Sequence, residues 1–259
     1  MGPSVTRLWR QTRRVTTLLA LALEGLRRPR SAGASPVGSA LWLHKACAAG
    51  LRTVGAELAI AGQPPEKGLI VSNHISYLDI LAFGAAAPCV FVSKAEVERW
   101  PIIGRYAREA GCAFVRRHDK VDAARANLSV AESLRGGVPV VLFPEGTTTD
   151  GKHVLRFHST MLQPAIDVQA PVTPCAIRYE LDGGDSSREI CWWGDMTLLP
   201  HVWNLLGKRG VRARIAFGQP IPPGKDRKQL SHDLRERVTQ LLDQLQESAG
   251  EPDCGKASV

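Results

Sequence analysis

The chain has 259 residues, of which 44% are hydrophobic and 22% are charged. These proportions are ordinary for a globular protein and exclude a disordered or fibrous chain, and the length suits one sizeable α/β domain with an appendage. Lys and Arg number 33 against 25 Asp and Glu, and the resulting net charge of +8 favours an anionic partner such as a nucleic acid, a phospholipid surface or a phosphorylated substrate.

The basic charge is concentrated in residues 1–30, which contain seven arginines and a single acid, Glu24. Apolar residues recur there at steps of three and four, whereas Arg7, Arg10 and Arg14 fall mostly on the other side of the expected helix. A helix with Trp and Leu on one face and Arg on the other is typical of the membrane interface. The apolar set is Val5, Leu8, Trp9, Val15, Leu19, Leu23 and Leu26.

The apolar stretch at residues 15–23 is too short to cross a bilayer, which needs roughly 20 residues. Two other interpretations stay open: the apolar core of a signal peptide, and a solvated helix that packs on its own domain. We favour an interfacial helix because Glu24 and two arginines follow the stretch directly, without a small-residue cleavage pattern. No other stretch is long and apolar enough to span a membrane.

A small-residue linker at 31–38 separates this helix from a second one, expected at 39–54. We therefore divide the chain into a membrane-associating helical segment (1–54), a catalytic domain (55–247) and a flexible tail (248–259).

From residue 55 onward, short apolar runs alternate with helical patterns. This alternation predicts an α/β fold with a mixed, largely parallel sheet flanked by helices, preceded by the N-terminal segment. The expected strands are 69–72, 89–92, 113–115, 138–143, 172–177, 189–193 and 211–218, and the expected helices are 77–87, 103–110, 121–134, 158–168, 197–206 and 227–245.

The six cysteines are scattered without a C-x-x-C pair, which argues against a disulfide framework and favours a reducing compartment. The seven histidines form no ligand pattern with one another or with cysteine, so we expect no metal.

The first chemically informative stretch follows the strand expected at 69–72. His74 precedes a predicted helix and Asp79 falls in its first turns, so the carboxylate can fold back onto the imidazole. Such a pair makes a general base, because the acid orients the ring and stabilises the imidazolium. An isolated H-x4-D is more often a helix cap beside an unrelated acid, so this pattern needs support from other positions.

A second stretch, residues 143–151, follows the apolar strand expected at 138–143 and reads FPEGTTTDG. Glycines and hydroxyls placed there can present backbone N–H groups to an anion. A loop rich in turn-forming residues is the simpler alternative.

Four blocks in order make the chain resemble the glycerolipid acyltransferase family, whose best-known members are 1-acylglycerol-3-phosphate acyltransferases. The blocks span roughly residues 55–220, and four in sequence are far more specific than any one of them. They are N-H-x4-D (Asn73, His74, Asp79), G-x-x-F-x-x-R (Gly111, Phe114, Arg117), F-P-E-G-T (143–147) and an apolar run ending in proline (172–174), and the run from Lys94 to Val97 also looks like bacterial members.

The resemblance implies a membrane-associated enzyme of phospholipid biosynthesis on the cytoplasmic face, which makes phosphatidic acid from 1-acyl-sn-glycerol-3-phosphate and an acyl thioester. His74 would deprotonate the acceptor hydroxyl and Asp79 would hold His74. The donor would be acyl-CoA or acyl carrier protein, the partners a lysolipid and a membrane surface, and no cofactor, metal or nucleic acid would be needed. The implied substrate-binding residues are Asn73, Lys94, Arg116, Arg117, Glu145, Gly146, Thr147 and Pro174.

One departure concerns the acceptor. Many members carry Arg after F-P-E-G-T, where this chain has Thr148, and a guanidinium is a good phosphate ligand. Residues 147–159 also look like those of relatives that acylate lyso-ornithine lipids, which makes that lipid the alternative acceptor. A lipid or thioester hydrolase is the alternative from another class, but the chain has no G-x-S-x-G nucleophile elbow.

Overall fold

The computed structural model describes residues 5–27, 35–100, 102–115 and 120–248. Its centre is a sheet of seven strands in the order β1-β7-β6-β2-β5-β3-β4, in which only the β6–β7 pairing is antiparallel. The predicted mixed, largely parallel sheet is therefore confirmed. The strands are β1 (Ala56–Ala61), β2 (Leu69–Ser72), β3 (Val90–Lys94), β4 (Ala113–Val115), β5 (Val140–Leu142), β6 (Val172–Leu181) and β7 (Val211–Phe217).

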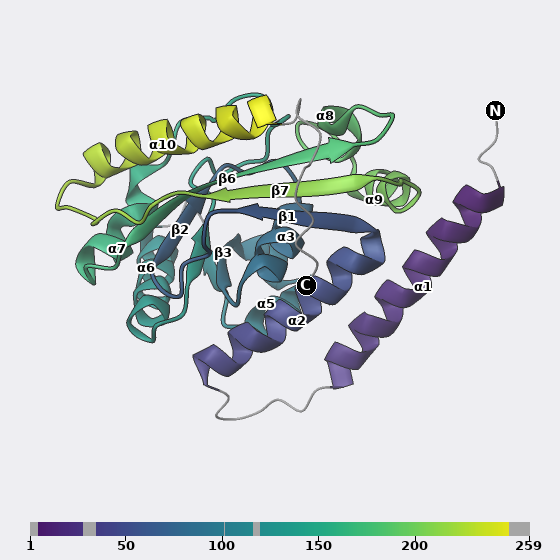
Figure 1. Ribbon diagram of the computed structural model, residues 1–259. Coiled ribbons are helices and arrows are strands. Elements are labelled where there is room, and N and C mark those ends of the chain that lie inside the picture. Colours follow the sequence, from purple (N-terminus) through teal and green to yellow (C-terminus); the bar gives the residue numbers. More distant parts are fainter. Residues whose placement is uncertain (1–4, 28–34, 101, 116–119, 249–259) are drawn as a thin grey trace.

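Helices cover both faces of this sheet (Figure 1). One core cluster joins the sheet to α2, α3 and α9, and the other joins it to α6, α7 and α10. The helices are α1 (Val5–Arg27), α2 (Pro36–Val54), α3 (Leu78–Ala86), α4 (Ala95–Glu98), α5 (Ile103–Glu109), α6 (Lys120–Arg135), α7 (Gln163–Asp167), α8 (Ser186–Glu189), α9 (Leu198–Leu206) and α10 (Arg227–Glu247), with a short 3-10 helix, η1 (Ser159–Leu162), before α7.

Helix ends follow local capping chemistry. The Ser35 side chain accepts a hydrogen bond from the Gly38 N–H, and Pro36 occupies the first turn of α2, where no N–H is needed. The helix ends at Gly55, whose φ of 77° is a left-handed conformation that glycine adopts readily. The Asp226 side chain caps α10 in the same way as Ser35 caps α2.

One predicted strand is absent, and one strand that is present was not predicted. Residues 189–193 are not a strand, because Glu189 ends α8 and the N–H of Trp192 donates to the carbonyl of Ile75 instead of joining a ladder. The edge strand β1 was missed because its sequence, AELAIA, has a single β-branched residue, Ile60, and no aromatic residue.

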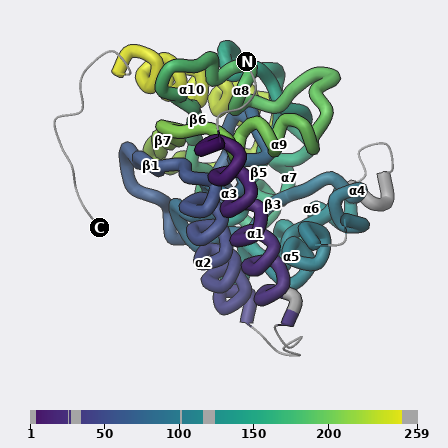
Figure 2. Tube along the Cα trace, turned by 90° about the vertical axis from the view of Figure 1, so that its right-hand side faces the viewer, coloured from purple at the N-terminus to yellow at the C-terminus, as the bar shows by residue number. Residues whose placement is uncertain are grey.

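The predicted N-terminal helix is present as α1, and its basic side faces the protein. Arg14 and Gln11 are buried and donate to the carbonyls of Leu206 and Trp203 in α9, whereas Val5, Trp9 and Leu23 are exposed. The buried polar residues and the exposed apolar residues each recur at helical spacing, so they lie on opposite sides of α1 and the exposed side is apolar. Figure 2 shows α1 on the face that is turned to the viewer, in front of α2. No helix in the described residues is both long enough and apolar enough to cross a bilayer.

Candidate active site

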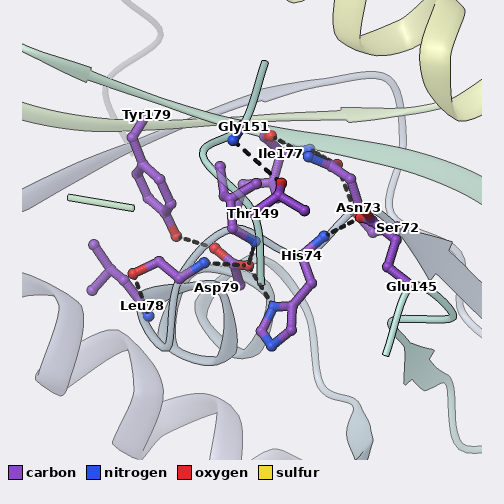
Figure 3. Close-up of polar contacts among 12 residues, drawn as sticks. Ser72, Asn73, His74, Leu78, Asp79, Glu145, Thr149, Gly151, Ile177 and Tyr179 are labelled. Carbon is purple, nitrogen blue, oxygen red and sulfur yellow. Dashed lines mark hydrogen bonds and ion pairs between the residues drawn. The ribbon is translucent and has the colours of Figure 1, made fainter. Parts of the chain in front are cut away.

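The candidate site lies where β2 runs into α3. Strand β2 is central, with β5 on one side and β6 on the other, and all three run in the same direction. Their carboxyl ends therefore meet at one edge of the sheet, where open α/β sheets bind ligands. This topology brings His74, which follows β2, together with residues after β5 and at the end of β6 (Figure 3).

The Asp79 carboxylate holds the ring of His74. One oxygen, Oδ2, accepts hydrogen bonds from His74 Nδ1 at 2.7 Å and from the backbone N–H groups of Ile75 and Ser76 at 2.8 and 3.1 Å. The other, Oδ1, accepts from the Tyr179 hydroxyl at 2.8 Å. An ionised carboxylate only accepts, so Nδ1 carries the proton and Nε2 is left with a free lone pair.

The imidazole is fixed in orientation yet reachable from outside. It stacks on the ring of Phe143 with centroids 4.2 Å apart and an interplanar angle of 14°. The His74 side chain is 21% exposed, whereas Asp79 is fully buried. A general base that acts on an incoming hydroxyl requires a buried acid to hold it and a ring that is partly exposed, and this pair has both.

Glu145 binds the backbone on both sides of the site. Its Oε1 accepts from the His74 N–H and its Oε2 from the Leu155 N–H, each at 2.8 Å. Burial raises the pKa of Glu145 to about 7, which the two N–H groups and His74 partly oppose and the charge of Asp79 increases. Both oxygens are already used, so the visible role of Glu145 is to position the His74 loop, while its predicted contact with substrate stays a prediction.

Asn73 joins β2 to β6. Its amide N donates to the Ile177 carbonyl at 3.0 Å, and its amide oxygen accepts from the Ile177 N–H at 2.9 Å. The side chain is buried, so these two hydrogen bonds fix the position of the next residue, His74, at the edge of the sheet.

The other predicted substrate-binding residues are distributed around this edge. Gly146, with φ of 77°, turns the chain after Phe143, and Thr147 is exposed beside it. Lys94 is exposed at the end of β3. Pro174 lies inside β6, which continues to Leu181, beyond the end expected at residue 177. Arg116 and Arg117 lie outside the described residues, so their predicted contact with the head group stays a prediction.

Tyr179, the second support of Asp79, was missed because no sequence pattern points to it. It lies 100 residues away from Asp79, in a strand where a tyrosine is an ordinary core residue. Burial and the nearby Asp79 charge raise its pKa well above the usual range, so the hydroxyl remains protonated and donates.

The segment between α8 and α9 also holds the His74 loop. The Ser76 hydroxyl donates to the Ile190 carbonyl at 2.8 Å, and the Trp192 N–H donates to the Ile75 carbonyl at 2.9 Å. On the other side, the Thr149 N–H donates to the His74 carbonyl at 3.0 Å. No group of three potential metal ligands occurs among the described residues.

Comparison with known proteins agrees with this geometry. A family model described as Acyltransferase matches residues 58–178. A lyso-ornithine lipid O-acyltransferase of Pseudomonas aeruginosa is 38% identical over 204 residues, which are 78% of this chain and 76% of the relative. A 1-acyl-sn-glycerol-3-phosphate acyltransferase of Neisseria meningitidis is 32% identical over 157 residues, which are 61% of each chain.

The fold also matches a solved structure, the 1-acyl-sn-glycerophosphate acyltransferase PlsC from Thermotoga maritima. The TM-score is 0.58 and the alignment covers 94% of this chain and 99% of the other, at 21% sequence identity. This likeness supports the arrangement of the sheet and helices.

Proposed function

The chain belongs to the Acyltransferase family, and we propose that it is a lysolipid O-acyltransferase in which His74 is the general base. The observation that carries the assignment is the His74–Asp79 pair, in which Nδ1 is bonded to a buried carboxylate and Nε2 has no hydrogen-bond partner among the described residues. Because Nε2 is accessible, it can accept the proton of a substrate hydroxyl, and that hydroxyl can then attack an activated acyl group bound beside it.

The reaction then needs few groups. Nε2 of His74 removes the proton of the acceptor hydroxyl while the oxygen attacks the thioester carbonyl, and Asp79 stabilises the imidazolium that forms. The tetrahedral oxyanion collapses, the C–S bond breaks, and the departing thiolate takes the proton from the imidazolium. The products are the acylated lipid and a free thiol, either coenzyme A or acyl carrier protein, and no covalent enzyme intermediate is formed.

Two acceptors fit this proposal. The resemblance and the Neisseria relative favour 1-acyl-sn-glycerol-3-phosphate. Two observations favour lyso-ornithine lipid. Thr148 stands where many family members have an arginine, and the match to the Pseudomonas relative covers more of both chains. An ornithine head group has no phosphate, so the absence of an arginine as phosphate ligand at position 148 fits this acceptor.

The exposed side of α1 supports a membrane surface as partner, and the cytoplasmic face of that membrane stays a prediction from the family resemblance. Trp9 is 64% exposed and Leu23 is 55% exposed on α1, and Leu199 on the neighbouring α9 is 80% exposed. Helices α1, α5 and α9 lie on the same face in Figure 2. An apolar surface that includes tryptophan suits the boundary between head groups and acyl chains.

Competition between acceptors tests the proposal. Purified protein in detergent is given a labelled acyl thioester with lysophosphatidic acid, lyso-ornithine lipid and lysophosphatidylcholine together, and lipid products and free fatty acid are separated. We expect one lysolipid to be acylated, and Thr148→Arg to shift use toward lysophosphatidic acid. Release of fatty acid without any acylated lipid would show a hydrolase and contradict the proposal.

A further inference from the structure

Six cations gather where the first turns of α1 meet the C-terminal end of α9. Three of them donate to α9 or to the residues directly after it: Arg7 to the Asn204 side chain at 2.6 Å, Arg10 to the Gly207 carbonyl at 2.5 Å and Arg14 to the Leu206 carbonyl at 3.0 Å. Cations at the C-terminal carbonyls of a helix are favourable, which accounts for part of the cluster. The members, which are joined by these bonds or by mutual charge repulsion, are Arg7, Arg10, Arg13, Arg14, Lys208 and Arg209.

Few carboxylates balance the positive charge of this cluster. Glu189 forms an ion pair with Lys208, but no other cation of the cluster has a carboxylate within ion-pair distance in the described part of the chain. Burial, followed by repulsion from Arg10, Arg13 and Arg209, lowers the pKa of Arg14 to about 10. Like charges this close together destabilise one another unless an anion is present.

Two members of the cluster are free to bind such an anion. Arg13 and Arg209 are exposed, and neither guanidinium donates a hydrogen bond to another described residue. The Arg13 guanidinium lies over the Trp9 ring at 5.1 Å, which orients it without using its donors. A guanidinium offers five N–H donors in a fork that matches a phosphate.

The exposed apolar residues around the cluster indicate which kind of anion it binds. Trp9 is 64% exposed and Leu8 is 49% exposed on α1, and Trp203 is 44% exposed on α9. A soluble anion would gain nothing from exposed tryptophan and leucine next to its site. At a membrane, however, tryptophan side chains lie at the head-group level, where arginines meet lipid phosphates.

We propose that Arg13 and Arg209, supported by Arg7 and Arg10, bind the phosphate of an anionic phospholipid at the α1–α9 junction. This lipid is a component of the surface on which the protein docks, and it differs from the lysolipid that is acylated at His74. The site is built from α1 and the end of α9, not from the β2–α3 connection. It rests on the proposed docking of α1 to a membrane and does not require acyl transfer.

The test compares vesicle binding by the full chain and by two matched variants. Arg13→Gln/Arg209→Gln removes two charges from the junction, and Lys228→Gln/Arg237→Gln removes two exposed charges from α10, on the other face of the sheet. Binding is measured by flotation with vesicles of phosphatidylcholine alone or mixed with phosphatidylglycerol. Each cation near an anionic surface contributes about fivefold, so the junction variant is expected to bind the mixed vesicles about 25-fold more weakly.

The control variant is expected to bind like the wild type, and all three proteins are expected to bind pure phosphatidylcholine equally. An equal loss in both variants would show an effect of net charge and overturn the proposal. Titration calorimetry with inorganic phosphate and with coenzyme A provides a second arm. If either binds and the junction variant abolishes that binding, the cluster serves a soluble phosphate or the donor, and the lipid proposal fails. Failure of acyl transfer with intact selective binding would contradict the proposed function alone.

Discussion

Replacing Asp79 by Asn separates the charge of the acid from its role in positioning His74. The asparagine oxygen can take the place of Oδ2 and accept from His74 Nδ1, Ile75 and Ser76. Its amide group then faces Tyr179, whose hydroxyl oxygen can accept in place of donating. Every buried partner stays paired, so we expect the variant to fold, with a free energy of unfolding about 1 to 2 kcal/mol lower because bonds to a neutral amide are weaker.

The effect on catalysis is larger. In the reaction, His74 becomes an imidazolium whose Nδ1 lies 2.7 Å from the carboxylate oxygen. Two unit charges about 4 Å apart interact by about 4 kcal/mol at an effective dielectric constant near 20. Loss of that stabilisation in the transition state lowers the rate by about 10³-fold.

The assay measures acyl transfer from a thioester to a lysolipid together with thermal unfolding. Tyr179→Phe serves as the control, because it removes one hydrogen bond to the same carboxylate and keeps the charge. We expect it to lose about 10- to 150-fold in rate, in line with one hydrogen bond to a charged group of about 1.5 to 3 kcal/mol. If Asp79→Asn keeps a rate within tenfold of the wild type, the carboxylate charge is not used and the role assigned to Asp79 is wrong.

Two further predictions concern stability. Since the pKa of Glu145 is about 7 in the folded protein and its ordinary value is 4.5, the free energy of unfolding should fall by roughly 3 kcal/mol as the pH rises from about 4.5 to about 7. Glu145→Gln should remove this part of the pH dependence in urea unfolding, and an unchanged pH profile would contradict it. Gly68 has φ of 95°, and a Cβ there would lie 2.3 Å from the Pro171 carbonyl oxygen, whereas Gly183 has φ of 68° and open space around it. Gly183→Ala should therefore cost about 1 kcal/mol, for the left-handed backbone alone, and Gly68→Ala distinctly more; equal losses in thermal or urea unfolding would show that the close approach is not important.

The strands that were predicted best are the buried ones. Residues 69–72 and 113–115 match β2 and β4, because a short apolar run between turn residues is typical of a strand that is covered on both faces. β1 escaped detection because an edge strand that is exposed over most of its length needs no apolar pattern. Residues 189–193 have a strand-like composition, but the N–H groups of residues 189–191 donate to carbonyls at the start of α8. The Trp192 N–H and the Ile190 carbonyl bond the loop that carries His74.

The sequence predicted the contacts of the site that lie within one short segment, and it did not predict those between distant segments. The His74–Asp79 pair is five residues apart within one strand-to-helix connection, so its geometry follows from the order of residues. Tyr179 reaches Asp79 only because β6 is placed next to β2, and the contacts of Glu145 depend on the path of the chain to Leu155. Such contacts depend on the tertiary fold and have no motif of their own.

The proposed mechanism requires His74 to remove the proton of a lysolipid hydroxyl during acyl transfer from a thioester. The decisive comparison is the rate of acylated-lipid formation by wild type and His74→Ala, with thermal unfolding recorded for both. We predict that the variant unfolds cooperatively near the wild-type temperature, because three other donors still hold Asp79, and that its rate is lower by about 10²- to 10⁴-fold. Wild-type rates in a folded His74→Ala protein would contradict the mechanism.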